Sequence, residues 1–205
     1  MSESPDIPAA LAKMGATALT ADLATTTGVG ELLVALFYLD RVHAAGFLTG
    51  VAEQWLGKLE EAIRVTTGLD FKPGREYLWT LACTYGRMAT HASTPSKQDI
   101  IYHAFFSEFS EEFANDADNA IFRELVETLD YNEAVFLAGV WALKQNTKRS
   151  PSSPDYHVAR RLLARGELYV AVVKEDGDNV KIIPTQALGK FVRFIKIKGV
   201  APKVR

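Results

Sequence analysis

The stretch ELYVAVVKEDGDNVKIIPTQALGKFVRFIK, from Glu167 to Lys196, decides how the C-terminal part of the chain folds. ELYVAVV alternates as a half-buried strand does, and KEDGDN contains Asp-Gly, a dipeptide typical of tight hairpin turns. VKII is the returning strand, and Pro184 ends it. Thr185 is a favoured N-cap residue in front of QALGKFVRFIKI. The stretch therefore predicts a β-hairpin followed by a basic helix.

Upstream of this hairpin, helical periodicity dominates the sequence. We expect helices over residues 7–26, 30–46, 49–68, 75–92, 96–115 and 116–143. The last range divides into two helices at Asp130–Asn132. Ser96 with Asp99 fits a capping box at the start of its helix. Apolar residues that recur at helical spacing predict a bundle, with a core formed by Leu33, Leu36, Phe37, Trp55, Leu59, Trp79, Phe105 and Phe109.

A single segment rich in Ser, Pro and charge, NTKRSPSSPD over residues 146–155, predicts an exposed loop. At its end, Ser153 is placed as an N-cap and Pro154 at the first helical position. The helix DYHVARRLLARG follows and ends at Gly166. The fold class is therefore mainly α, with a helical bundle over residues 1–115 and an α+β unit with one β-hairpin over residues 116–205.

Charge is distributed unevenly along the chain. The formal net charge is −2, but residues 1–143 hold 9 Lys and Arg against 20 Asp and Glu, whereas residues 144–205 hold 14 against 5. Such asymmetry indicates a second unit with a different partner. The alternative is that the basic part forms a solvated face or pairs with the acidic helical part.

From Ala120 to Lys196 the order of elements is helix, helix, loop, helix, hairpin, helix, and this order resembles a winged-helix domain. LDYNEAVFLAGVWAL resembles the second helix, and VARRLLARGELYV resembles the recognition helix entering the first wing strand. IIPTQALGKFVRFI is similar to the ending that many such domains share. The same ending follows a helical region in the bacterial Abi-alpha-like family, which is linked to abortive phage infection, and residues 104–137 are similar to that family's helical segment.

The resemblance implies a basic face that could neutralise nucleic-acid phosphates. Its candidate residues are Arg160, Arg161 and Arg165 on the third helix, Lys181 on the returning strand, and Lys190, Arg193, Lys196 and Lys198 in the last helix and tail. The wing tip opposes this interpretation, because Glu175, Asp176 and Asp178 would repel phosphates.

The sequence gives little support to an enzyme. Arg87 and His91 are the only candidates for a helical nuclease, and their spacing is shorter than the Arg-to-His motif of HEPN-class RNases. No motif indicates a metal or a cofactor, so we expect neither. Cys83 lies in the apolar run LWTLACTYG, which favours a buried thiol.

We therefore expect a cytoplasmic, non-catalytic adaptor or regulatory protein that acts through a protein partner or self-association, with phage defence as its setting. Nucleic-acid binding through the basic face is the first alternative, and a helical nuclease is the second. The acidic N-terminus and the short length of the apolar run around Glu31 predict neither a secretory signal nor a membrane span.

Overall fold

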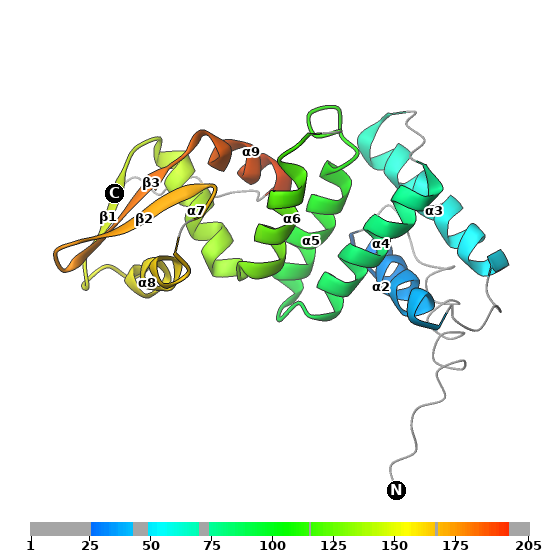
Figure 1. The fold of residues 1–205 in the computed structure, drawn as a ribbon, viewed down its shortest axis with the longest axis horizontal. Helices are drawn as coiled ribbons and strands as arrows, with labels where there is room; N and C mark the ends of the chain where they lie inside the picture. Colours follow the sequence, from blue (N-terminus) through cyan, green and yellow to red (C-terminus); the bar gives the residue numbers. More distant parts are fainter. Residues whose placement is uncertain (1–25, 43–48, 70–73, 115, 167, 197–205) are drawn as a thin grey trace, which may run out of the picture. The chain divides into compact units, whose positions relative to one another are not determined.

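The computed structural model describes residues 26–42, 49–69, 74–114, 116–166 and 168–196. These residues form eight helices and one three-stranded antiparallel sheet (Figure 1). Contacts divide the chain into two compact units, Met1–Asp116 and Ala117–Arg205. The prediction of a mainly α chain with a C-terminal α+β unit is confirmed. The helix expected before Thr26 lies outside the described residues, as does Lys198.

The N-terminal unit is a helical bundle. Its helices are α2 (Thr26–Val42), α3 (Thr49–Thr67), α4 (Arg75–Thr90) and α5 (Pro95–Ser107). Gly68, at φ 71°, follows α3 in the left-handed conformation that glycine tolerates best. α2 and α4 contact each other closely. At Gly86 a Cβ atom would lie 2.1 Å from the carbonyl oxygen of Leu33, so only glycine permits this approach.

The predicted core of the bundle is buried, with one exception. Phe105 and Phe109 are fully buried and pack edge to face, with ring centroids 5.2 Å apart. Trp79 was expected in the core but is half-buried, because its indole Nε1 donates a hydrogen bond of 2.9 Å to the exposed carboxylate of Asp40.

The predicted capping box at Ser96 and Asp99 is wrong by two residues. α5 begins at Pro95, and the Thr94 side chain accepts a hydrogen bond from the backbone N–H of Lys97. Proline at the first helical position fixes the start one residue after Thr94, because its ring already has a helical φ and its missing N–H needs no partner there.

The C-terminal unit contains four helices and the whole sheet. Its elements are α6 (Asn119–Thr128), α7 (Tyr131–Leu143), β1 (Thr147–Arg149), α8 (Tyr156–Ala164), β2 (Ala171–Asp176), β3 (Asn179–Pro184) and α9 (Gln186–Ile195). The strand order is β1-β3-β2, so β3 is central. Phe122, Phe191 and Phe194 are buried together where α6 contacts α9.

Three details of this unit correct the sequence analysis. Residues 146–155 were expected to be loop throughout, but Thr147–Arg149 form β1 and pair with β3. Ser153 was expected to cap α8, but α8 begins at Tyr156 after Asp155, and the hydroxyl of Ser153 accepts from the N–H of Ser150 within the preceding turn. Thr185 does precede α9, although its hydroxyl donates to the carbonyl oxygen of Tyr169 instead of capping the helix.

The register of the hairpin gives the sheet two distinct faces. The turn lies at Gly177, which has φ 63°, and Asp176 pairs with Asn179. One face carries buried side chains such as Val180 and Ile182, and α8 contacts both β2 and β3. The opposite face is called here the outer sheet face, and it consists of Lys148, Val172, Lys174, Asp176, Asn179, Lys181 and Ile183.

Candidate interaction surface

A buried carboxylate at the start of α7 organises the cations of α8. Asp130 and Glu133 form a capping box, in which Asp130 accepts from the N–H of Glu133 and Glu133 accepts from the N–H of Asp130. The side chain of Glu133 has no exposed surface. A carboxylate removed from water in this way requires charged or hydrogen-bonding partners.

Two of the predicted phosphate-binding arginines supply those partners. Arg165 donates to both carboxylate oxygens of Glu133, at 3.1 and 2.7 Å. Arg161 forms an ion pair with Asp130 at 2.8 Å, and its Nε lies 3.9 Å from Glu133. These guanidinium groups therefore tie α8 to the N-terminus of α7. Their contribution is to the fold of the unit.

Arg160 and Lys190 also form ion pairs inside the C-terminal unit. Arg160 donates to Glu175 of β2 at 2.9 Å. Lys190 of α9 lies 3.2 Å from Asp118, which also accepts from the hydroxyl of Tyr169 at 2.8 Å. The acid at Glu175, which was expected to repel a phosphate backbone, thus holds a cation of α8.

The remaining predicted cations are dispersed. Arg193 is exposed on α9, and Lys196 follows that helix with φ 45°. The seven candidate residues that the structure describes therefore do not form one uncovered stripe. Arg160, Arg161 and Arg165 are brought together, but each faces a carboxylate.

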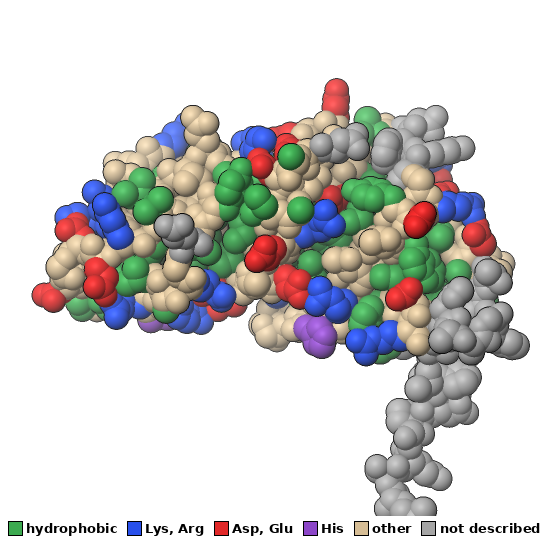
Figure 2. Space-filling model, in the orientation of Figure 1, with side chains coloured by type: hydrophobic (Ala, Val, Ile, Leu, Met, Phe, Trp, Pro, Cys, Tyr) green, Lys and Arg blue, Asp and Glu red, His purple; other side chains and the backbone are tan. Residues whose placement is uncertain are grey.

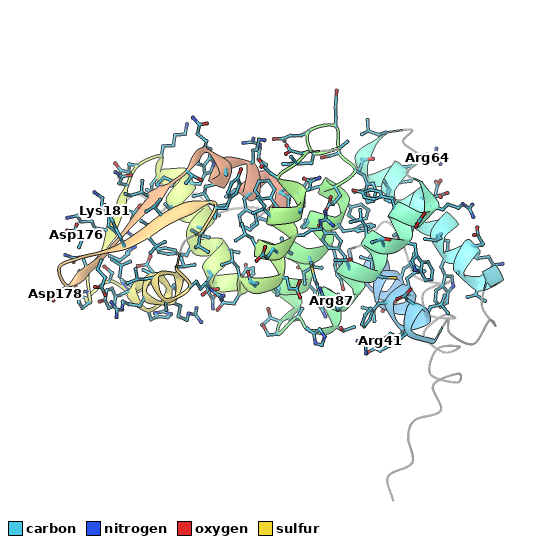
Figure 3. All side chains as sticks on the ribbon, in the orientation of Figure 1. Arg41, Arg64, Arg87, Asp176, Asp178 and Lys181 are labelled. Carbon is cyan, nitrogen blue, oxygen red and sulfur yellow. The ribbon has the colours of Figure 1, made fainter. Side chains whose placement is uncertain are left out.

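A different set of cations lies on the outer sheet face. Lys148 of β1, Lys181 of β3 and Lys174 of β2 are directly opposite one another in the register of the sheet. Their side chains therefore form a row across all three strands, and like charges placed directly opposite destabilise a sheet. We call these residues the lysine row; Figure 3 labels Lys181 at its centre.

One carboxylate meets the lysine row. Asp176 forms an ion pair with Lys148. The hydrogen bond from Lys148 lowers the pKa of Asp176 below its usual value, and the charges of Lys148, Lys181 and Lys174 add to this effect. Among residues that the structure describes, Lys174 and Lys181 have no carboxylate within ion-pair distance. Figure 2 shows basic and acidic side chains intermingled over this end of the unit.

An apolar pair adjoins the lysine row. Val172 of β2 lies opposite Ile183 of β3 on the same face, and Val172 remains 49% exposed. The outer sheet face thus combines this apolar pair with two ammonium groups that have no carboxylate within ion-pair distance among the described residues. Sequence reasoning missed Lys148 and Lys174 as site residues. The Asp-Gly turn sets the register of the hairpin, so the sequence could have predicted that Lys174 lies opposite Lys181. The position of Lys148 could not be predicted in this way, because β1 was expected to be loop.

A groove of about 460 Å³ lies between α6 and the connection from α8 to β2. Ile121, Leu125 and Tyr169 contribute to its walls, together with Arg165. Arg165 donates two hydrogen bonds to Glu133, so the carboxylate of Glu133 largely compensates its positive charge. The exposed carboxylate of Glu124 and the hydroxyl of Thr128 also line the groove, so its walls are of mixed polarity.

The described part of the N-terminal unit does not support the nuclease alternative, because Arg87 and His91 lie in different environments. Arg87 is part-buried in the last turn of α4, and His91, the residue after Thr90, is exposed. Within the described ranges, no group of three His, Cys, Asp or Glu side chains is placed to hold a metal ion. Cys83 is part-buried near the carbonyl oxygen of Leu36, and burial raises the pKa of its thiol to about 12.

Comparison with known proteins adds no family: no family model, no curated protein and no solved structure matches the chain. Among the described helices, none is both long enough and apolar enough to cross a membrane.

Proposed function

We propose that the protein is a non-catalytic adaptor or regulatory protein that acts through protein–protein contacts made by its outer sheet face. One observation carries this proposal. The outer sheet face presents Lys174 and Lys181 without a carboxylate partner among the described residues, beside the exposed aliphatic side chain of Val172. The arginines of α8, by contrast, are engaged by acids of their own unit.

The setting of phage defence rests on resemblance. IIPTQALGKFVRFI, which contains the end of β3 and the whole of α9, is similar to the ending found in winged-helix and Abi-alpha-like proteins. The order α6, α7, α8, hairpin, α9 supports the winged-helix resemblance, although β1 is inserted between α7 and α8. In this proposal the hairpin is the wing, and its outer face is the part that meets a partner.

Site-specific photo-crosslinking tests the proposal. A photoreactive phenylalanine analogue placed at Val172 of the full chain should give a discrete crosslinked protein in cells. The same analogue at Tyr131, a 36% exposed position at the start of α7, is the matched control. The Val172 adduct should disappear in a Lys174→Glu/Lys181→Glu background. Equal adducts at Val172 and Tyr131, or adducts that persist in that background, would refute the proposal.

Nucleic-acid binding is the second candidate function, because Lys174 and Lys181 could also contact phosphates. Glu175, Asp176 and Asp178 near the turn oppose it. A fluorescence anisotropy titration of a labelled duplex at low and near-physiological salt decides between the two. Binding that falls steeply with salt and is lost in Lys174→Glu/Lys181→Glu would favour nucleic acid. If Arg160→Glu/Arg161→Glu/Arg165→Glu abolished binding while the unit remained folded, the face would be α8 instead.

A further inference from the structure

We infer that the outer sheet face binds an acidic protein segment that carries an aliphatic side chain next to its carboxylates. This inference rests on the proposed function and names the chemistry of the partner. It depends on three features of the face: the lysine row, a carboxylate two residues along β2 on one side of that row, and the apolar pair two residues along the strands on the other side.

The lysine row is costly for folding in the absence of a partner. Lys181 lies opposite Lys148 on one side and Lys174 on the other, so three ammonium groups repel across adjacent strands. Asp176 forms an ion pair with Lys148, whereas its charge reaches Lys181 and Lys174 only at longer range. A carboxylate from outside, placed between Lys174 and Lys181, would relieve the remaining repulsion.

Asp176 shows that a carboxylate fits this surface. Its side chain lies on the same face, and Figure 3 labels it on the hairpin together with Lys181. The ammonium groups of the lysine row stabilise its charged form. A partner's Asp or Glu would meet the same groups in the same exposed setting.

The apolar pair sets the spacing that the partner needs. Val172 and Ile183 lie two residues along their strands from Lys174 and Lys181, which corresponds to about 7 Å. In an extended partner segment, alternate side chains on one face have this spacing, and side chains one helical turn apart are similarly placed. An aliphatic residue and an acid at these separations would meet the apolar pair and the lysine row together.

A nucleic-acid backbone fits the same face less well. Phosphates follow one another at regular intervals and would approach Asp176, whereas a peptide can place its acids away from it. Val172 and Ile183 offer no hydrogen-bond donor to phosphate or sugar. Nucleic acid is therefore an outcome of the test and is not the partner inferred.

Peptide titration tests the inference with the full chain. The first probe is fluorescein-labelled Glu-Glu-Leu-Ser-Glu-Glu-Leu, in which Leu and Glu alternate on one face of an extended chain. The second replaces both Leu with Ser, and the third is labelled oligo(dT). The full chain should bind the Leu peptide roughly tenfold more tightly than the Ser peptide, because burial of a leucine side chain is worth at least that factor. Lys174→Glu/Lys181→Glu should abolish binding of the Leu peptide, and Val172→Ser should remove its advantage over the Ser peptide.

Lys144→Glu/Arg41→Glu changes the net charge equally at exposed cations outside the sheet, and this control should retain binding. Circular dichroism confirms that each variant is folded. Equal affinity for the Leu and Ser peptides, or binding of oligo(dT) alone, would overturn the inference. If neither peptide binds but the Val172 crosslink persists, this partner chemistry fails and the proposed function stands. If the crosslink is absent as well, both fail.

Discussion

At the scale of single residues, Glu133 explains why the predicted basic helix is not an open basic surface. Its side chain completes the capping box of α7 and accepts two hydrogen bonds from Arg165. A buried carboxylate of this kind is stable only while its cation is present. Sequence reasoning placed the break between α6 and α7 at Asp130–Asn132, but the partner of Glu133 comes from a helix whose packing no local pattern encodes.

Glu133→Gln should destabilise the C-terminal unit by about 2 kcal/mol, because glutamine can still cap α7 but leaves Arg165 without its counter-ion. Urea unfolding followed by circular dichroism measures the change. Glu124→Gln, on an exposed position of α6, is the matched control and should have little effect. An unchanged midpoint for Glu133→Gln would show that the pair with Arg165 contributes nothing.

Gly86→Ala should destabilise the bundle by about 1–3 kcal/mol, since the new methyl group would overlap the carbonyl of Leu33. Gly57→Ala in α3 is the control, because nothing lies within 4 Å of its Cβ position. Alanine is the better helix former, so this control should gain up to about 1 kcal/mol. Equal changes in the thermal midpoints of the two variants would contradict the close approach of α2 to α4.

Cys83 should react slowly with iodoacetamide in the native protein at pH 8. Only the deprotonated thiolate reacts with iodoacetamide. Because the pKa of the Cys83 thiol is raised to about 12, little thiolate is present at pH 8. In urea the thiol should regain its ordinary pKa and react much faster, and intact-mass measurement reports both rates. Rapid native labelling at pH 8 would mean that the thiol is not desolvated.

At the scale of elements, strong local signals predicted the helices and the hairpin, and long-range pairing determined the rest. Asp-Gly fixed the turn at Gly177, and periodicity indicated the helices of both units. β1 could not be predicted, because Thr147–Arg149 has no apolar alternation and is a strand only by pairing with β3. Lys148 was missed for that reason, whereas the pair of Lys174 with Lys181 could have been derived from the predicted hairpin.

Lys181→Glu should stabilise the C-terminal unit by about 0.2–1 kcal/mol, because it replaces two like-charge cross-strand pairs with opposite-charge pairs. Urea unfolding at low salt measures the gain, which should shrink at high salt as the charges are screened. Lys144→Glu, outside the sheet, is the comparison. A loss of stability in Lys181→Glu at both salt concentrations would show that the lysines of the row do not repel one another in the folded unit.

At the scale of the whole molecule, the uneven charge of the sequence has a partly local origin. Asp118, Asp130 and Glu133 belong to the acidic first 143 residues, yet they pair with cations that follow them within the C-terminal unit. These acids and their partners offset each other inside one unit. The basic charge left over includes the lysine row, whose position follows from the sheet.

The most direct measurement is amine footprinting of the full chain, in which brief acetylation is quantified at each lysine by mass spectrometry. The account predicts that Lys174 and Lys181 react several-fold faster than Lys190, whose ammonium group pairs with Asp118. Arginine modification in the same sample should leave Arg165 protected by Glu133. Slow acetylation of Lys174 and Lys181 together with rapid modification of Arg165 would contradict the account, because the sheet face would then be covered and α8 exposed.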